Sequence, residues 1–234
     1  MDGFININKP SGITSYDVIR FLKKRFHIQE KIGHTGTLDP LASGVLVICI
    51  GKATKSAPLF LEMEKEYLAT MRLGLTTDTD DSEGKVLSTA SWEGITEEEI
   101  YQAATRFSGK ISQIPPVVSA IRVGGTRLYA LHRKGQKVTP PKKTVTIYRL
   151  HLTQIKLPFI SFEVTCSRGT YIRALCRDIG AALGCGGTQT ALIRKRVGSF
   201  TLDQSVSLEI IEQTGMSTHL IPLGALSQWK KNLS

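Results

Sequence analysis

Asp39 is the residue whose type and setting most directly suggest chemistry in this chain. It lies in residues 33–44, GHTGTLDPLASG, between a predicted helix and a predicted buried strand. The glycines allow tight backbone paths, and Pro40 disfavours helical geometry at Asp39, so the carboxylate stands on an extended or turn backbone beside a rigid strand. Such a carboxylate could act as a nucleophile, whereas its local sequence alone favours the more ordinary role of an Asx-turn or a helix cap.

The cysteines and the clustered acids give little support to metal or disulfide chemistry. The cysteines lack CxxC spacing and occupy apolar or glycine-rich contexts, which favours buried or free thiols; they are Cys49, Cys166, Cys176 and Cys185. An acidic loop contains Asp78, Asp80 and Asp81, and its ordinary interpretation is a solvated one. We therefore expect no metal site, and a metal nuclease built on this loop is a weak alternative.

Positive charge is concentrated in one stretch of the sequence. The net charge is +10 and the pI is near 9.5. Residues 100–162 contain no Asp or Glu, whereas residues 62–99 are rich in acids. The basic stretch carries Arg106, Lys110, Arg122, Arg127, Arg133, Lys134, Lys137, Lys142, Lys143, Arg149 and Lys156. A solvated surface is the plain interpretation, but segregation on this scale favours binding to a phosphate backbone.

Helices and strands alternate along the chain. Apolar residues at helical spacing predict helices over residues 14–27, 96–109 and 170–184, the first two of which begin with capping boxes. Residues 45–50, VLVICI, form a short β-branched run typical of a buried strand, and residues 66–73 and 160–166 alternate like half-buried strands. A further helical segment is expected near residues 206–213. These patterns predict an α+β fold with a mixed central sheet flanked by helices.

Residues 114–143 interrupt this alternation and read as an extended, mobile arm. They contain two Pro-Pro pairs, a Gly-Gly pair and few large apolar residues. A floppy insertion competes here with a clamp on nucleic acid, and the basic charge favours the clamp. The expected RNA contacts are Arg122, Arg127, Arg133, Lys134, Lys137, Lys142 and Lys143.

The length and hydropathy of the chain set its general class. Its 234 residues, 41% of them hydrophobic, are enough for one large domain with a substantial core. No apolar run approaches the roughly 20 residues that span a bilayer, and Met1–Phe4 does not begin a secretory signal. We expect a soluble protein of the cytoplasm.

Residues 33–46, GHTGTLDPLASGVL, closely resemble the catalytic motif of the TruB family of tRNA pseudouridine synthases. Other stretches resemble the family's motifs in the same order: NKPSGITS at 8–15, KEY at 65–67, LGLTTDTD at 73–80, PPVVSA at 115–120 with Tyr129, GTYIR at 169–173, and residues 192–200. The resemblance runs from about residue 6 to residue 200. It implies the pseudouridine synthase fold, with a largely antiparallel sheet and residues 114–143 inserted as an RNA-binding thumb.

The resemblance also implies an activity and roles for single residues. Isomerisation of a uridine in tRNA to pseudouridine, at position 55 of the T-arm, needs no redox change or external group, so no cofactor is expected. Asp39 matches the family's nucleophile, Arg173 its ionic partner, and Tyr67 the tyrosine that stacks on the flipped base. The remaining matches to the substrate pocket are His34, Tyr171, Leu192 and Lys9. Whether the aspartate attacks the uracil ring or the ribose C1′ stays open.

Some features depart from the family's pattern. Val118 stands where many relatives have an aromatic residue, and Ile193 interrupts a Leu-Arg-Arg run, so RNA contacts could be redistributed among Arg194, Lys195 and Arg196. We expect residues 1–200 to form the catalytic domain and residues 201–234 a short extension, too short for the PUA domain of many relatives.

Two other functions compete with the synthase. One is a non-catalytic module that binds or folds tRNA on the same scaffold, and the presence of both Asp39 and Arg173 argues against it. The other is glycoside hydrolysis, which uses two carboxylates, and these motifs offer no convincing second acid. We expect a monomer with tRNA as its partner and no membrane association.

Overall fold

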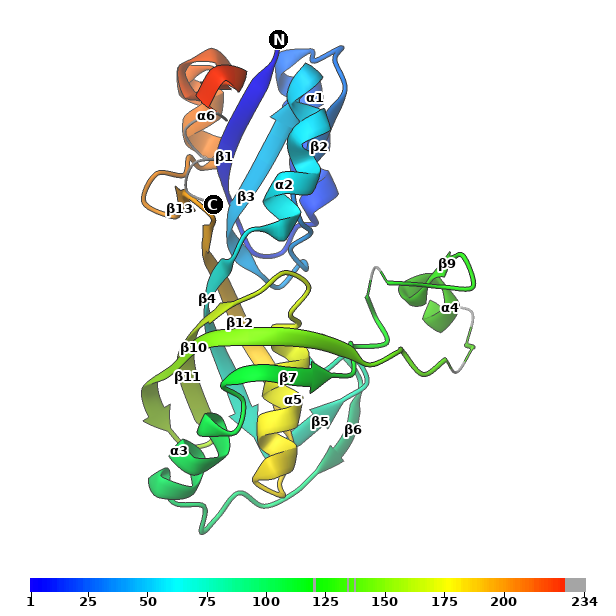
Figure 1. Cartoon of the computed structure of the whole chain (residues 1–234), viewed down its shortest axis with the longest axis vertical. Coiled ribbons are helices and arrows are strands. Elements are labelled where there is room, and N and C mark those ends of the chain that lie inside the picture. The colour runs from blue at the N-terminus through cyan, green and yellow to red at the C-terminus, as the bar shows by residue number, and fades with distance from the viewer. Residues whose placement is uncertain (120, 134, 137, 226–234) are drawn as a thin grey trace. The chain divides into compact units, whose positions relative to one another are not determined.

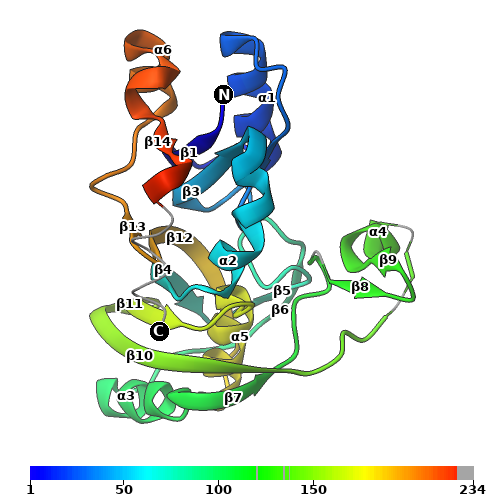
Figure 2. The ribbon, with the colours of Figure 1, turned by 45° about the horizontal axis from the view of Figure 1, so that its top comes forward.

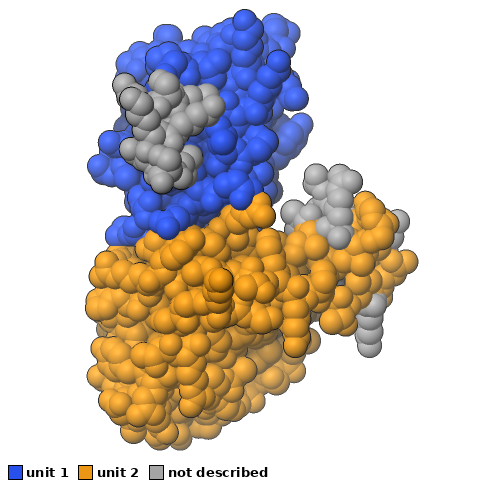
Figure 3. All heavy atoms as spheres, in the orientation of Figure 1, with its two compact units in different colours: residues 1–67, 193–234 blue, residues 68–192 orange. Residues whose placement is uncertain are grey.

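The computed structural model describes residues 1–119, 121–133, 135–136 and 138–225. The chain divides into two compact units (Figure 3). Unit 1 consists of residues 1–67 and 193–234, and unit 2 of residues 68–192. Strands β4 (Lys65–Leu73) and β12 (Gly187–Val197) each contain residues of both units.

Unit 1 is built on a strand pair with helices to either side. β1 (Gly3–Lys9) pairs antiparallel with β3 (Ser43–Ile50), and β3 also pairs with β2 (Ile32–His34) and, in parallel, with the end of β12. The short strands β13 (Phe200–Thr201) and β14 (Ile221–Pro222) pair with β12 and β1. Helices α1 (Ser15–Phe26) and α2 (Ala57–Glu62) lie to one side of β1 and β3, and α6 (Leu208–Thr214) lies to the other (Figure 1).

The local sequence explains why α1 and β3 form where they do. The side chain of Thr14 accepts a hydrogen bond from the backbone N–H of Asp17, and the Asp17 carboxylate accepts one from the backbone N–H of Thr14, so both ends of the predicted capping box are in place. The apolar stripe of the helix is buried, and all of β3 after its first residue is buried, as its continuous apolar run predicts. These two elements lie before and after the Asp39 segment in the sequence.

Unit 2 contains antiparallel strands with helices packed on them. The strands are hydrogen-bonded in the order β12, β4, β11 (Phe159–Cys166), β10 (Lys143–Lys156) and β7 (Gly109–Gln113). A separate hairpin consists of β5 (Leu75–Thr77) and β6 (Val86–Thr89). Helix α3 (Glu97–Thr105) begins with the predicted capping box, and seven of the eleven residues of α5 (Ile172–Ala182) are buried. Gly180 of α5 lies so close to the backbone of Gly186 and Gly187 that any side chain there would collide with it.

The arm leaves β7 and returns into β10 (Figure 2). Part of it is more regular than the sequence analysis expected. Strands β8 (Arg122–Val123) and β9 (Thr126–Arg127) form a hairpin, followed by helix α4 (Leu128–Arg133). Gly124 and Gly125, which link the strands, have φ angles of +56° and +81°, as a tight turn of type I′ requires. The expectation of an extended arm is therefore wrong for residues 122–133.

The predicted fold class is confirmed. The structure is a mixed α+β fold with a large, mostly antiparallel sheet, and the expected helices and strands lie within a few residues of their predicted bounds. In the described part of the chain no helix is long and apolar enough to cross a membrane.

Candidate active site

The loop that carries Asp39 is held at Leu38 by the first residue of α1. The Ser15 hydroxyl donates a hydrogen bond to the carbonyl oxygen of Leu38 (2.9 Å) and accepts one from its N–H (2.8 Å). Ser15 and Leu38 are both buried. One hydroxyl can fill both roles because it has one donor and two acceptor positions. The backbone immediately before Asp39 is thus fixed to the helix.

Lys9 and its neighbours hold the other side of the loop. The Lys9 side chain is fully buried, and its ammonium donates to the carbonyl oxygens of Pro10 (2.8 Å), Ile13 (2.7 Å) and Pro40 (3.4 Å). The N–H of Gly12 also donates to Pro40, at 2.8 Å, and the hydroxyl of Ser11 donates to the carbonyl of Leu41. A buried ammonium is costly unless its protons are hydrogen-bonded, so this arrangement makes residues 9–15 the support of the Asp39 loop.

Arg194 supplies a third support that the sequence analysis missed. Its side chain is 2% exposed, with Nε donating to the carbonyl of Val45 (2.7 Å) and Nη2 to the carbonyl of Gly36 (3.0 Å). The guanidinium therefore ties the start of the Asp39 loop to β3, which follows it. Gly44 permits this packing, because a side chain there would collide with the Arg194 backbone. In β12 the buried Leu192 predicts that Arg194 faces the same way, and this alternation could have identified it.

Residues 194–196, among which RNA contacts were expected to be redistributed, differ in their exposure. Arg194 is buried, and the ammonium of Lys195 lies 3.7 Å from the Glu66 carboxylate. Arg196 pairs with Glu66 at 3.3 Å and with Glu64 at 3.9 Å. Arg194 is thus buried in unit 1, whereas Lys195 and Arg196 are partly exposed, and RNA contacts through them stay a prediction.

His34 ends β2, just before the Asp39 loop. Burial, and secondly the nearby positive charge of Arg194, lower the pKa of the His34 imidazole below its ordinary value. Its Nδ1 atom is buried and has no hydrogen-bond partner among the described residues. The His34 imidazole therefore binds a proton less readily than an ordinary histidine.

Asp39 itself lies at a turn and is half-buried. Its carbonyl oxygen accepts a hydrogen bond from the N–H of Ala42 at 3.1 Å, so the chain turns back toward β3 directly after the carboxylate. Lys9, His34 and Asp39 all belong to unit 1, and Lys9 contacts the residue that follows Asp39. Tyr67, on β4, is the last residue of the first segment of unit 1 and is 9% exposed.

Arg173 and Tyr171 lie together at the start of α5 in unit 2. Arg173 is 5% exposed, and its guanidinium lies 3.3 Å from the carboxylate of Asp81. Its Nη1 and Nη2 atoms donate to the carbonyl oxygens of Thr79 and Val118, both at 2.9 Å. Because these contacts come from two segments, the planar guanidinium has a fixed orientation. Leu192, the last residue of this unit, is 8% exposed.

Gln113 fixes the backbone at Tyr171. Its side-chain amide accepts a hydrogen bond from the N–H of Tyr171 (3.1 Å) and donates to the carbonyl oxygen of Tyr171 (3.3 Å). Gln113 is 1% exposed and ends β7. No motif used in the sequence analysis included it.

The expectation that residues 78–81 form a solvated acidic loop is wrong for two of the three acids. Asp80 and Asp81 are 9% and 5% exposed, and they pair with Arg177 and Arg173 of α5. Burial raises the pKa of the Asp80 carboxyl, and the charges of the two arginines oppose that rise. The loop therefore positions arginines. Among the described residues, no group of three His, Cys, Asp or Glu side chains could hold a metal ion.

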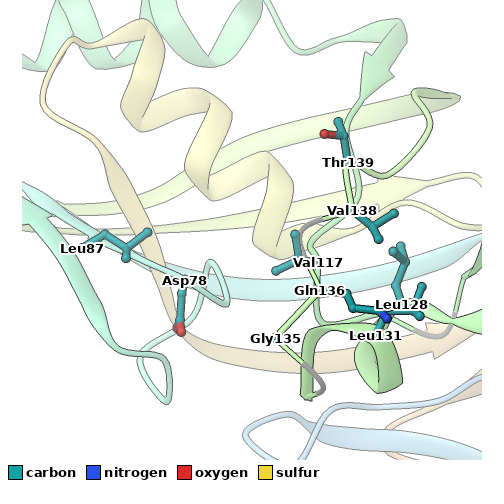
Figure 4. A pocket seen from close by; sticks show the side chains of 9 residues that line it. All are labelled: Asp78, Leu87, Val117, Leu128, Leu131, Gly135, Gln136, Val138 and Thr139. Carbon is teal, nitrogen blue, oxygen red and sulfur yellow. The ribbon is translucent and has the colours of Figure 1, made fainter.

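Most of the expected RNA contacts in the arm cannot be placed. The side chains of Arg122, Arg127 and Arg133, and all of Lys134 and Lys137, lie outside the described residues. Lys142 and Lys143 are exposed, and the ammonium of Lys143 packs against Gly169, just before α5. A cleft of about 500 Å³ is lined by Leu128 and Leu131 of α4, by residues 135, 136, 138 and 139 of the returning part of the arm, and by Val117, Asp78 and Leu87 (Figure 4).

The fold, with an aspartate on a supported loop and an arginine at the start of a buried helix, defines a protein of the pseudouridine synthase class. Two solved structures support this class. One chain in the crystal structure of a Cbf5-Nop10-Gar1 complex is 32% identical in sequence to this chain, and the two superpose with a TM-score of 0.71. The match covers 90% of this chain and 54% of that chain. A chain of an H/ACA RNP bound to a substrate RNA containing 2′-deoxyuridine is 28% identical with a TM-score of 0.68, covering 99% of this chain. This chain spans about half the length of both.

The chain belongs to the TruB family. The family model for the N-terminal domain of TruB family pseudouridylate synthases matches residues 23–172, and that for the C-terminal domain of tRNA pseudouridylate synthase B matches residues 173–220. The tRNA pseudouridine synthase B of Clostridium kluyveri is 49% identical, with 95% of this chain and 76% of that protein covered. The protein of the same name from Clostridium tetani is 46% identical, with 99% and 80% covered. The family expected from the sequence is confirmed.

Proposed function

We propose that this chain isomerises one uridine of tRNA, at position 55 of the T-arm, to pseudouridine, with Asp39 as the nucleophile and no cofactor. The observation that carries the proposal is the construction of the Asp39 loop. In a chain that belongs to the TruB family, buried Lys9, Ser15 and Arg194 hold this loop on either side of the carboxylate. A turn residue with no further role would not need this support.

The reaction balances within the substrate. The bond between N1 and C1′ breaks, the uracil rotates, and a bond forms between C5 and C1′; the proton on C5 leaves and N1 gains one. Asp39 supplies the transient covalent bond, either to the uracil ring or to C1′, and is released unchanged. Nothing is oxidised or reduced, so the chemistry needs no cofactor.

Arg173 is proposed to keep Asp39 ionised. A carboxylate in a site that excludes water needs a positive partner, because desolvation otherwise raises its pKa and removes the nucleophile. The contacts of Arg173 with Asp81, Thr79 and Val118 support this role, because they fix the guanidinium without the substrate. The assignment of Arg173 as the partner rests on the family resemblance.

The flipped uridine is proposed to stack on Tyr67 and to contact Tyr171 and Leu192, while His34 completes the substrate pocket and Lys9 packs beneath it. The arm would bind the tRNA backbone through Arg122, Arg127, Arg133, Lys134, Lys137, Lys142 and Lys143. Under this proposal, residues 1–200 form the catalytic domain, and a monomer acts on tRNA in the cytoplasm.

The test is to locate the product. An unmodified tRNA transcript and a hairpin of its T-arm are incubated with the protein, and pseudouridine is mapped by carbodiimide treatment and primer extension. We expect one new pseudouridine, at position 55, in both RNAs and none in a transcript with cytidine there. Tight binding with no pseudouridine in either RNA would instead indicate a non-catalytic tRNA-binding module. Product at another position would overturn the assignment of the T-arm.

A further inference from the structure

Arg177 forms an anchor that no motif of the sequence explains. It lies on α5 one turn after Arg173, so both side chains project from the same face of the helix. Its Nη1 atom lies 2.8 Å from the Asp80 carboxylate, and its Nε and Nη2 atoms lie 2.9 Å and 2.8 Å from the Asp178 carboxylate. Nη2 also donates to the carbonyl oxygen of Ile114 at 2.8 Å.

Ile114 is the first residue of the arm. Its neighbour Gln113 ends β7 and pairs with Lys143, the residue at which the arm returns into β10. The base of the arm is therefore closed by one strand pairing, and Ile114 is the first residue beyond it. A contact that holds the Ile114 carbonyl sets the direction in which the arm leaves the sheet.

The first leg of the arm runs along α5 and is held at each end by an arginine. Arg177 binds the carbonyl of Ile114, and Arg173 binds the carbonyl of Val118 four residues later. The leg has no helix or strand of its own. Both arginines also bind the loop of residues 79–81. The arm is thus joined to the helix that carries the proposed ionic partner of Asp39.

We propose that Arg177 is a positioning residue for RNA binding, which holds the base of the arm in the orientation that grips the tRNA. The inference rests on the proposed function and adds to it a residue that need not touch the substrate. Its fork of donors fits this position, because the nitrogen atoms of one guanidinium bind two carboxylates and a carbonyl oxygen. A lysine would keep the charge but could not hold all three partners in that geometry.

Loss of the anchor has a specific kinetic signature. Without the Arg177 anchor, the arm of the free protein samples several orientations, and tRNA binds only the competent one. The apparent dissociation constant for tRNA is then the intrinsic constant divided by the fraction of protein in the competent orientation, so the apparent affinity falls. Once tRNA is bound, its own contacts hold the arm, and the chemical step proceeds. A residue that only stabilised the fold would instead lower the active fraction of the protein and leave the affinity of that fraction unchanged.

The experiment compares the full-length protein with Arg177→Met, Arg177→Lys and the control Arg72→Met, which removes one positive charge from an exposed position of unit 2. The dissociation constant for tRNA, the single-turnover rate at saturating tRNA and the amplitude of that turnover are measured at one salt concentration, with the thermal midpoint of each variant. We expect the dissociation constant to rise about tenfold in Arg177→Met and at least threefold in Arg177→Lys. The saturated rate should change less than threefold, and Arg72→Met should change the dissociation constant less than twofold.

Two results would overturn the proposal. One is an unchanged dissociation constant in both Arg177 variants. The other is a reduced amplitude of the single turnover with an unchanged affinity for tRNA, which marks a structural role. If Arg177→Met folds poorly, Arg177→Lys still allows this comparison. Failure of the proposed function is a separate outcome, since the unaltered protein would then bind tRNA and form no pseudouridine.

Discussion

Replacement of Arg194 by methionine tests whether the support of the Asp39 loop matters for activity. Methionine fills a similar volume but cannot donate to the carbonyl oxygens of Gly36 and Val45. Each buried carbonyl left without a partner costs about 1–3 kcal/mol. Removal of the buried charge offsets part of this loss of stability, because a guanidinium in the interior carries its own desolvation cost. We therefore expect the free energy of unfolding to fall by about 3 kcal/mol.

Thermal unfolding can measure this fall in the free energy of unfolding. For a chain of this length, about 1 kcal/mol shifts the thermal midpoint by about 2–4 °C, so the midpoint should fall by about 6–12 °C. Arg196→Met is the matched control, because Arg196 is a partly exposed residue of the same strand that pairs with Glu66 and Glu64. Exposed pairs contribute about 0–1 kcal/mol, so its midpoint should fall by less than about 4 °C.

The effect on activity should exceed the effect on stability. At a temperature where Arg194→Met is fully folded, we expect its single-turnover rate on tRNA to fall at least about tenfold, because a shift of about 1 Å in a reacting group can cost about a hundredfold. Arg196→Met should retain its rate. Equal rates in the two variants would refute the reasoning that Arg194 positions the loop.

His34 gives the same substitution an independent readout. Removing the charge of Arg194 should move the pKa of the His34 imidazole part of the way back to its ordinary value, while burial keeps it lowered. The folded protein binds a proton at His34 less readily than the unfolded chain. This contribution to stability is therefore complete above the ordinary histidine pKa of about 6.5 and is lost as the pH falls below it. Titration by NMR should show a higher His34 pKa in Arg194→Met, and an unchanged pKa would contradict the electrostatic assignment.

Three further substitutions test single contacts. Ser15→Ala leaves the N–H and carbonyl of Leu38 without their partner, so the free energy of unfolding in urea should fall by about 2 kcal/mol; a loss below about 0.5 kcal/mol would contradict the geometry. Asp81→Asn keeps the shape of the side chain but removes the negative charge beside Arg173. The turnover rate at saturating tRNA should then fall at least about tenfold, while the affinity for tRNA stays within about threefold of that of the unaltered protein. A lower affinity with an unchanged saturated rate would make Asp81 an RNA-binding residue. Gln113→Leu can neither accept from the N–H of Tyr171 nor donate to its carbonyl oxygen, so its thermal midpoint should fall below that of the unaltered protein; an unchanged midpoint would exclude a role for these two hydrogen bonds.

The elements around Asp39 could be predicted because their determinants are local. The capping box of Thr14 and Asp17 and the apolar run of β3 both lie within a few residues of the structure they determine. The hairpin at Gly124 and Gly125 was also local, and the Gly-Gly pair between two short strands is its usual sequence pattern. The prediction of an extended arm relied on the Pro and Gly content of the stretch and did not consider this pattern.

The buried ion pairs could not be predicted because their partners are far apart in the sequence. The three acids at residues 78, 80 and 81 resemble a solvated loop until α5, more than ninety residues later, supplies Arg173 and Arg177. The same limit applies to Arg194 and Gly36, which are 158 residues apart. Family resemblance pointed to Asp39 and Arg173, whereas the contacts by which Arg194 and Asp81 position them followed from the structure.

The central claim is that Asp39 is the nucleophile, and tritium release tests it most directly. A tRNA transcript labelled with tritium at C5 of its uridines loses that label only when C5 bonds to C1′. The account predicts release by the unaltered protein and none above background by Asp39→Asn, with tRNA affinity within about threefold and an unchanged thermal midpoint. Release by Asp39→Asn at the rate of the unaltered protein would contradict the account.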